Sequence, residues 1–371
     1  MKLNIAVLPG DGIGPEVTNQ SIKVLNAIAE KFNHQFTYKH ALMGAIAIDE
    51  TGEPLPQKTL DICLDSDAIL FGAIGDPKYD NNPNAKVRPE QGLLALRKAL
   101  NLYTNIRPVK AYDALLDKSP LKEQIIKGAD MVIYRELTSG IYFGKKYLSE
   151  DGTKASDDCA YTEEEISRIT HEAFKAAEKR NNKVTLVDKA NVLETSRLWR
   201  KVVSNIAKEY PSVELDFLFV DNAAMQMILN PKQFDVILTE NMFGDIISDE
   251  ASVIGGSIGL LASASTGNDK ALFEPIHGSY PQAKGKGIAN PIASILSSAM
   301  LLDHFGLTEE ADVIREASEK SIELGICTPD LIPNSTYTTT NVGEFIEEYI
   351  TNINELSLNS DNMEVGQSTI I

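Results

Sequence analysis

LNIAVLPGDGIGPE, residues 3–16, passes from an apolar strand through a glycine-rich turn straight into a helix. Residues Leu3–Leu8 are mostly branched apolar residues, a pattern typical of a buried strand. Pro15 suits the first turn of a helix, where its missing N–H costs nothing. The residues expected on the buried face of that helix are Val17, Val24, Leu25, Ile28 and Phe32. A strand that enters a helix through so short a turn opens an α/β fold.

The glycines of this turn do not match the dinucleotide-binding fingerprint GxGxxG. The third glycine, Gly14, arrives one residue early and Pro15 follows it. We therefore expect a tight strand-to-helix turn close to a cofactor in preference to a Rossmann nucleotide site.

Further strands are predicted along the chain, with helices between them. They are Ala68–Ala73, Met131–Leu137, Val184–Val187, Leu215–Val220 and Phe234–Thr239. This alternation predicts an α/β architecture in which much of the sheet is parallel. Asp151-Gly152 indicates a hairpin within residues 142–161, either an oligomerisation arm or a plain surface excursion. The polar stretch 356–371 is expected to be a loose tail.

Composition narrows the class of protein. The 371 residues carry a formal charge of −18, which argues against nucleic acids and anionic membrane surfaces as partners. The length suggests two domains or one large α/β unit. The sequence contains no apolar run long enough to span a membrane. Because its first residues lead straight into a predicted strand, we expect no signal peptide. The three cysteines lie far apart, so we expect a soluble protein of a reducing compartment, the cytoplasm.

Three aspartates suggest a site for a hard divalent cation. Asp221 ends a predicted strand, while Asp245 and Asp249 lie four residues apart at the start of a helix, on one face. Carboxylates without His or Cys suit Mg²⁺ or Mn²⁺. The alternative is that acids near a helix N-terminus only complement its dipole.

Basic residues supply the complementary charge. Lys189, at the end of a strand, is a candidate for proton transfer or an ordinary solvated lysine. Arg135 stands in an apolar strand, and such an arginine needs an anion, either a dicarboxylate substrate or a structural ion partner. Arg97 and Arg107 have the same two readings. The turn-rich segments Glu274–Ser279 and Gly285–Pro291 offer backbone donors and His277 to a ligand.

Taken together, these segments resemble the β-decarboxylating 2-hydroxyacid dehydrogenases, the family of isocitrate and isopropylmalate dehydrogenases. The resemblance runs from about residue 3 to residue 350. It rests on GDGIGPE (10–16), EQGLLALR (90–97), REL (135–137) with Tyr142, VDKANVL (187–193), NMFGDIISD (241–249) and EPIHGS (274–279).

The resemblance implies a role for each candidate residue. Arg97, Arg107 and Arg135 would clamp the substrate carboxylates. Asp221, Asp245 and Asp249 would hold Mg²⁺ or Mn²⁺. Lys189 would accept the hydroxyl proton and Tyr142 would protonate the carbon that loses CO₂. The remaining substrate-binding residues would be Glu90, Leu93, Leu94, Asn191 and Val192, together with Asp221.

The same resemblance implies a fold, a cofactor and an assembly. The fold would have two domains and would not be a Rossmann fold: residues 1–102 with 256–355, and residues 103–255 with the hairpin arm. A homodimer is implied, because Lys189, Asp221, Asn191 and Val192 would reach the site from the partner subunit. NAD would lie on Gly75, Glu90, Glu274, His277, Gly278, Ser279, Gln282, Ala289, Asn290 and Asp330.

Two segments bear on specificity. Relatives that take isocitrate place a hydroxyl residue where Leu93 and Leu94 form an apolar wall, which suits an isopropyl group. The expected reaction is the oxidative decarboxylation of (2R,3S)-3-isopropylmalate to 4-methyl-2-oxopentanoate with CO₂ and NADH, in leucine biosynthesis. D-malate or tartrate is the alternative substrate, and an inactive regulatory relative is the alternative class. Gln282 stands where NAD-dependent relatives usually carry Asp; it adds no charge attraction to a 2′-phosphate, which favours NAD.

Overall fold

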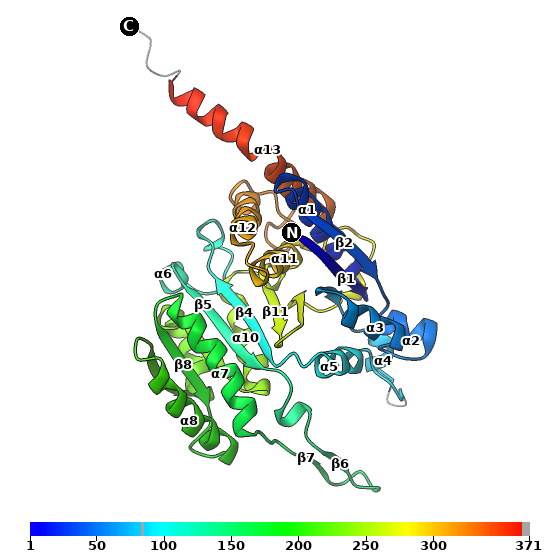
Figure 1. Ribbon diagram of the computed structural model, residues 1–371, viewed down its shortest axis with the longest axis vertical. Coiled ribbons are helices and arrows are strands. Elements are labelled where there is room, and N and C mark those ends of the chain that lie inside the picture. The colour runs from blue at the N-terminus through cyan, green and yellow to red at the C-terminus, as the bar shows by residue number, and fades with distance from the viewer. Residues whose placement is uncertain (83–84, 366–371) are drawn as a thin grey trace.

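The computed structural model describes residues 1–82 and 85–365 (Figure 1). In this part of the chain, ten strands form one sheet in the order β2-β1-β3-β12-β11-β4-β5-β10-β8-β9. The strands are β1 (Lys2–Gly10), β2 (Gln35–His40), β3 (Ala68–Ala73), β4 (Thr104–Lys110), β5 (Asp130–Glu136), β8 (Lys183–Asp188), β9 (Glu214–Phe219), β10 (Val236–Thr239), β11 (Ala262–Thr266) and β12 (Ala271–Pro275).

The sheet consists of two parallel blocks joined by antiparallel strands. β2, β1, β3 and β12 are parallel to one another, as are β5, β10, β8 and β9. Between the blocks, β11 pairs antiparallel with β12 and β4, and β4 pairs antiparallel with β5. Three successive reversals make the two blocks run in opposite directions. Their carboxyl ends therefore do not share one edge, and a site shared by the blocks must lie at the junction.

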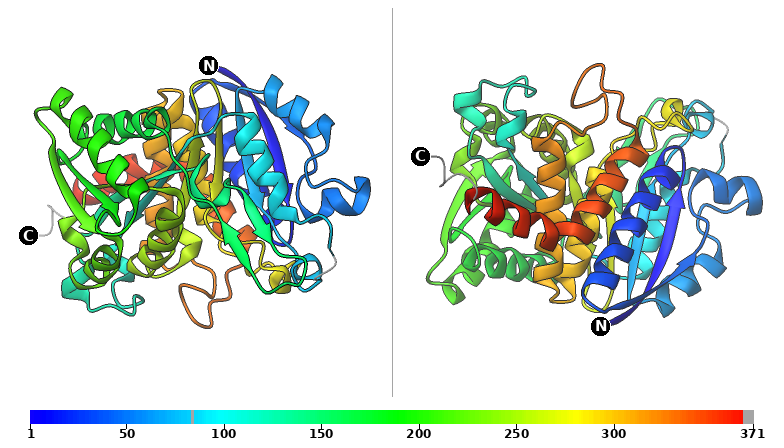
Figure 2. Two further views of the ribbon diagram at one scale, coloured as in Figure 1. Left: turned by 90° about the horizontal axis from the view of Figure 1, so that it is seen from below. Right: turned by 90° about the horizontal axis from the view of Figure 1, so that it is seen from above.

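Helices cover both faces of the sheet (Figure 2). The first block packs against α1, α11, α12 and α13, and the second against α7 and α8 on one face and α9 and α10 on the other. The helices are α1 (Gly14–Lys31), α2 (Ala45–Thr51), α3 (Gln57–Asp65), α4 (Pro77–Asp80), α5 (Pro89–Ala99), α6 (Glu123–Ile126), α7 (Glu163–Glu178), α8 (Glu194–Ile206), α9 (Val220–Leu229), α10 (Asn241–Ala251), α11 (Ile292–His304), α12 (Thr308–Glu323) and α13 (Thr339–Val365).

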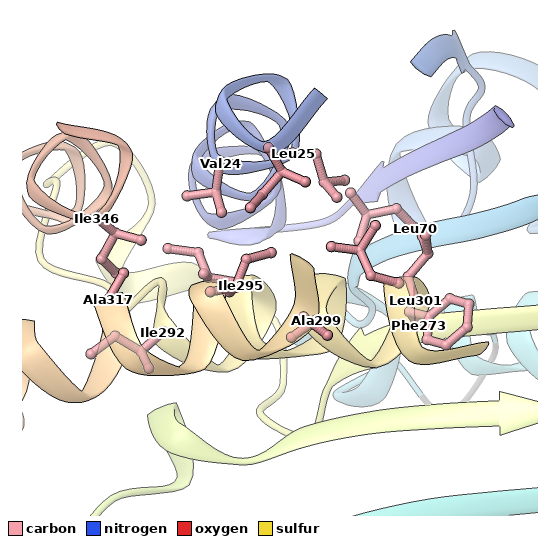
Figure 3. Close-up of a cluster of buried hydrophobic side chains, with 14 of the residues drawn as sticks. Val24, Leu25, Leu70, Phe273, Ile292, Ile295, Ala299, Leu301, Ala317 and Ile346 are labelled. Atoms are coloured by element: carbon pink, nitrogen blue, oxygen red, sulfur yellow. The ribbon is translucent and has the colours of Figure 1, made fainter. Parts of the chain in front are cut away.

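Alternation along β1 explains why the first block is buried on both faces. Leu3, Ile5 and Val7 point into one apolar cluster, whereas Ala6 and Leu8 point into another on the opposite face. In the first cluster, Val24 and Leu25 of α1 lie above Ile295 of α11, with Leu70 and Phe273 of the sheet beside them (Figure 3). The strand and the helix of the opening sequence thus build one core.

The glycine turn that joins them is held against the segment after β12. Gly12 has φ +56°, and a Cβ there would lie 1.9 Å from the carbonyl oxygen of Ser279. The N–H of Ile13 donates to that same oxygen at 2.8 Å. The expectation of a tight turn without the Rossmann fingerprint agrees with this geometry, since the glycine permits close backbone packing.

The predicted strands are confirmed, with ends displaced by at most two residues. The hairpin is also confirmed, as β6 (Lys146–Leu148) paired antiparallel with β7 (Ala155–Asp157). The sequence reasoning missed β2, β4, β11 and β12. It also placed Asp221 just after a strand, whereas the structure starts α9 one residue earlier, at Val220, directly after β9.

The expected loose tail differs from the structure as far as the chain is described. Helix α13 continues to Val365, and Figure 1 shows its last turns extending away from the sheet. The stretch 344–365 contains neither Pro nor Gly, so nothing in the backbone chemistry stops the helix. Residues 366–371 lie outside the described residues.

The domain boundaries near residues 102 and 255 stay a prediction, because one continuous sheet runs through both parts. No helix among the described residues has the length and apolar character needed to span a membrane.

Candidate active site

A cavity of about 470 Å³ lies at the junction of the two parallel blocks. Its lining draws on β3, α5, β4, β5, α10 and the segment after β12. Eight sequence-predicted residues line it: Glu90, Leu93, Leu94, Arg97, Arg107, Arg135, Tyr142 and Asp245. So do Glu274, His277 and Gly278 from the predicted cofactor segment.

Arg135 is buried on β5 and is held by α10. Its Nε and Nη2 donate to Oδ1 of Asn241 at 3.2 and 2.8 Å, and its Nη1 donates to Oδ1 of Asp245. Gly244 makes this contact possible, because a Cβ there would lie 2.6 Å from Cγ of Arg135. Glu240 caps α10 by accepting the N–H of Phe243. The helix thereby presents Asn241, Asp245 and Asp249 at spacings of four, on one face.

Arg107 lies beside Arg135 on the neighbouring strand β4. Its Nε donates to Oδ1 of Asn105 at 2.6 Å and its Nη1 to Oγ of Ser248 at 2.5 Å. Burial, reinforced by the charge of Arg135, lowers the pKa of Arg107 to about 10. Two guanidinium groups held side by side in a buried place create a strong demand for anions.

Arg97 reaches the cavity from α5 and forms a buried ion pair. Its Nη2 donates to Oε1 of Glu274 at 2.7 Å, and its Nε has no hydrogen-bond partner among the described residues. Leu93 and Leu94, one turn earlier on the same helix, also line the cavity, with Phe71, Leu137 and Ile276. One helix therefore supplies both a cation and an apolar wall.

Tyr142 lies in a single helical turn (Gly140–Tyr142) after β5, and the guanidinium carbon of Arg135 is 5.7 Å from the centre of its ring. Its hydroxyl donates to Oδ2 of Asp245 at 2.8 Å. Burial, together with this contact to a carboxylate, raises the pKa of Tyr142 to about 12, so the phenol keeps its proton. Burial acts to raise the pKa of Asp245, but the charges of Arg135 and Arg107 outweigh it and lower that pKa.

The three aspartates do not come together within one chain. Asp245 and Asp249 share a face of α10, and Arg107 lies 3.6 Å from a carboxylate oxygen of each. Asp221 belongs to α9, which follows β9. In the sheet, β8 lies between β9 and β10, the strand that precedes α10. Across the described residues, no three His, Cys, Asp or Glu side chains gather in a way that could hold a metal ion.

Lys189 pairs with Asp221 away from the cavity. Lys189 Nζ donates to Oδ1 of Asp221 at 2.6 Å, and the side chain of Asp221 is 67% exposed. This contact lowers the pKa of the Asp221 carboxyl. Asn191 and Val192, in the turn that follows Lys189, are exposed as well. These four predicted residues form a second, outward-facing group.

A second cavity, of about 380 Å³, adjoins the first and shares His277 and Gly278 with it. Ala289, Asn290 and Asp330 line it, and Asn290 Nδ2 donates to Oδ2 of Asp330 at 3.1 Å. His277 Nε2 is buried without a partner among the described residues, and burial lowers its pKa. A buried nitrogen that lacks a partner in a cavity is suited to a polar ligand.

The other predicted cofactor residues lie around these cavities. Ser279 is buried beneath the glycine turn, and Gly75, with φ +114°, allows its loop to approach Glu90. Gln282 is exposed in the short helical turn Pro281–Ala283 and does not belong to the lining of either cavity.

Sequence reasoning missed several residues that organise the site. Asp11, in the glycine turn, is buried and accepts three backbone N–H groups, from Ala45, Ile46 and Gly75, at 2.8 to 2.9 Å. The roles of Asn105 and Asn241 as acceptors for the arginines were not predicted from the sequence. A polar residue two positions before Arg107 in an apolar strand was the available signal for Asn105.

Comparison with known proteins identifies the family of the chain. The model of the isocitrate/isopropylmalate dehydrogenase family matches residues 4–348. The chain belongs to this family. A 3-isopropylmalate dehydrogenase of Bacteroides fragilis is 53% identical over 352 residues, covering 94% of this chain and 99% of the relative. One from Bacillus subtilis is 51% identical over 364 residues, covering 96% and 100%.

Solved structures of the family share the fold. The crystal structure of an isocitrate dehydrogenase from Methylococcus capsulatus superposes with a TM-score of 0.85 at 36% identity, covering 94% of this chain and 99% of that one. The expected fold class, an α/β fold of the isopropylmalate/isocitrate dehydrogenase type, is therefore confirmed.

Proposed function

We propose that the protein catalyses the NAD-dependent oxidative decarboxylation of 3-isopropylmalate, as a step of leucine biosynthesis in the cytoplasm. The observation that carries this proposal is one cavity in which three buried arginines face an apolar wall of Leu93 and Leu94. Two carboxylates and one branched alkyl group are what such a cavity would bind. The names of relatives about half identical over nearly the whole chain support the same substrate.

The arginines would bind and orient the substrate. Arg107 and Arg135 present neighbouring guanidinium groups, and Arg97 approaches from α5. A hydroxyl-lined wall would accept the third carboxylate of isocitrate. Leu93 and Leu94 instead disfavour binding of that third carboxylate, because a carboxylate on an apolar surface loses hydration without gaining a hydrogen-bond partner.

Two residues would move protons. Lys189 would take the proton from the C2 hydroxyl while NAD, when bound, accepts hydride from C2. Tyr142 would give its proton to C3 after CO₂ has left. The raised pKa of Tyr142 supports the role of donor, since the phenol is protonated at any physiological pH.

The donor set suits a hard divalent cation only if two chains contribute. Asp245 and Asp249 supply carboxylates on one helix face, and Asp221 of a second copy would complete the set. When bound, Mg²⁺ or Mn²⁺ would polarise the C2 oxygen and stabilise charge that develops there.

A homodimer is therefore part of the proposal. Lys189 and Asp221 lie at the surface. Exposed apolar side chains lie on the same elements and on a neighbouring helix: Val192 after β8, Met225 and Leu229 on α9, and Ile246 on α10. Such a patch is typical of an interface between subunits. The hairpin arm exposes Tyr147 and Leu148 in the same way.

The second cavity is the proposed place of NAD. His277, Asn290 and Asp330 offer polar contacts there, and the cavity shares His277 and Gly278 with the first. Gln282 would lie at the ribose without a positive charge for a 2′-phosphate. With domains at residues 1–102 with 256–355 and at 103–255, the first cavity would lie between the two domains and the second within the first domain.

The test is NADH formation by the purified protein with Mg²⁺ and NAD⁺, comparing 3-isopropylmalate, D-malate and isocitrate. We expect a preference for 3-isopropylmalate of about 100-fold or more in kcat/KM over isocitrate, from the desolvation of one carboxylate. A preference for D-malate would replace the substrate, and activity with NADP⁺ alone would overturn the reading of Gln282.

A further inference from the structure

Both polar atoms of the Asn241 side-chain amide are hydrogen-bonded, the oxygen to Arg135 and the nitrogen to the backbone of Ser139. Its Oδ1 accepts two N–H groups of the Arg135 guanidinium, and its Nδ2 donates to the carbonyl oxygen of Ser139 at 3.1 Å. Only 1% of the residue is exposed. Because Nδ2 is bound to a carbonyl, the orientation of the amide is fixed, and its oxygen must face Arg135.

Asn105 orients Arg107 through the same kind of hydrogen bond. Its Oδ1 accepts from Nε of Arg107, while its Nδ2 donates toward the Ala264 carbonyl oxygen and toward the hydroxyls of Ser263 and Ser265, at 2.7 to 3.2 Å. Asn105 and Arg135 are direct neighbours in the register of β4 and β5. Two asparagines thus hold two adjacent arginines from different elements.

The contrast with Arg97 shows why an amide matters. Arg97 is held by the carboxylate of Glu274, which cancels its charge in the buried cavity. An amide oxygen is a good acceptor and orients a guanidinium equally well, yet it carries no net charge. Asparagine therefore fixes the geometry of Arg107 and Arg135 without adding a carboxylate of its own. The carboxylates that these arginines do meet, Asp245 for both and Asp249 for Arg107, belong to the proposed metal site.

We propose that Asn241 and Asn105 are positioning residues that aim Arg135 and Arg107 at the substrate carboxylates without adding negative charge of their own. The inference rests on the proposed function in one respect only, that these arginines bind a dicarboxylate. Neither asparagine is given a chemical step.

The test separates orientation from charge at position 241. Asn241→Ala removes the acceptor, and Asn241→Asp keeps an acceptor of the same shape but adds a negative charge beside the substrate. We expect both variants to raise the KM for the substrate about tenfold or more, with a smaller change in kcat and none in the KM for NAD⁺. Calorimetric titration of the substrate without cofactor should show the same weakening.

Folding is checked by thermal unfolding, because the new carboxylate faces the Ser139 carbonyl. Should Asn241→Asp fail to fold, Asn105→Asp is measured, since the hydroxyls of Ser263 and Ser265 can turn to donate to it. Asn26→Asp, on an exposed part of α1, adds the same charge far from the cavity and serves as the matched control.

Unchanged substrate affinity in the alanine and aspartate variants would overturn the proposal. An aspartate variant that binds as well as wild type, beside a weakened alanine variant, would overturn the part played by charge. If wild-type protein turns over D-malate and not 3-isopropylmalate, the proposed function fails, and the same ratios measured with D-malate still decide this inference.

Discussion

Arg97 and Glu274 form an ion pair inside the substrate cavity, with Nη2 and Oε1 2.7 Å apart and both side chains about nine-tenths buried. The two residues lie 177 positions apart in the chain. They meet because α5, which carries Arg97, packs through Leu93 and Leu96 into the apolar cluster that contains Leu272 of β12. The carboxylate of Glu274 is therefore already paired with the guanidinium group that the substrate would bind. Substrate binding then requires Arg97 to exchange Glu274 for a substrate carboxylate.

Glu274→Gln should make this exchange easier. The amide keeps an acceptor for Arg97 but removes the competing charge, so we expect substrate binding without cofactor to tighten, on the order of three- to tenfold. Calorimetry measures this affinity. Glu90→Gln removes a carboxylate from the same cavity and leaves the Arg97 pair intact; an equal gain in that variant would show that only the overall charge matters.

Two inactive variants should restore activity when they are mixed. We expect Lys189→Ala and Tyr142→Phe each to lose about 100-fold or more in turnover, as for loss of a proton-transfer group. A mixed dimer has one site with the native Tyr142 and the partner subunit's native Lys189. Random reassociation should therefore recover about a quarter of wild-type activity. If the mixture stays as inactive as its parents, Lys189 does not act across the interface.

Removal of divalent metal should abolish turnover, and Mn²⁺ or Mg²⁺ should restore it. Asp249→Asn and Asp221→Asn should each weaken metal affinity about tenfold or more, measured as the metal concentration that gives half-maximal activity. Asp61→Asn removes an exposed carboxylate from α3, away from both cavities, and is the control. Activity that survives chelation would remove the metal from the mechanism.

Tyr161→Phe should change the alkaline stability of the protein. Burial raises the pKa of this phenol well above its ordinary value of 10.0. The folded state then retains a proton that the unfolded state releases, so stability is full below pH 10 and falls as the pH rises beyond it. The contribution of one such group is about 1.4 kcal/mol per pH unit.

The phenylalanine variant lacks this group, so its free energy of unfolding should fall less steeply above pH 10. At neutral pH it should be less stable by about 1–3 kcal/mol, because the N–H of Asn241 loses the Tyr161 oxygen. Denaturant unfolding at several pH values measures both effects. Tyr147→Phe, on the exposed hairpin, should leave the slope as in wild type.

Local patterns predicted those parts of the fold that local chemistry decides. Thr162 and Glu165 have the spacing of a capping box, and both of its hydrogen bonds form at the start of α7. Strands such as β3 were visible as short apolar runs. β4 and β11 were not: Pro108 and Lys110 interrupt β4, and β11 consists of Ala, Ser and Thr. Their place in the sheet depends on tertiary pairing, which no local pattern reveals.

For the site, the sequence indicated the charged residues but not the groups that orient them. The arginines were recognisable because a charge in an apolar strand needs an explanation. The partners of Arg107 were not, since Ser248 lies 141 residues away in the chain. The separation of Asp221 from Asp245 was likewise invisible to helix spacing, because it follows from the order of β9, β8 and β10.

The insertion of β11 and β12 between β3 and β4 bears on how the chain folds during synthesis. The second parallel block and its helices come from one contiguous segment, residues 104–251, and can form as soon as that segment has left the ribosome. β3 must wait for β12, about 200 residues later, so the first block closes last. Pulse-labelled hydrogen exchange should find β8 and β10 protected before β1 and β3; simultaneous protection would contradict this order.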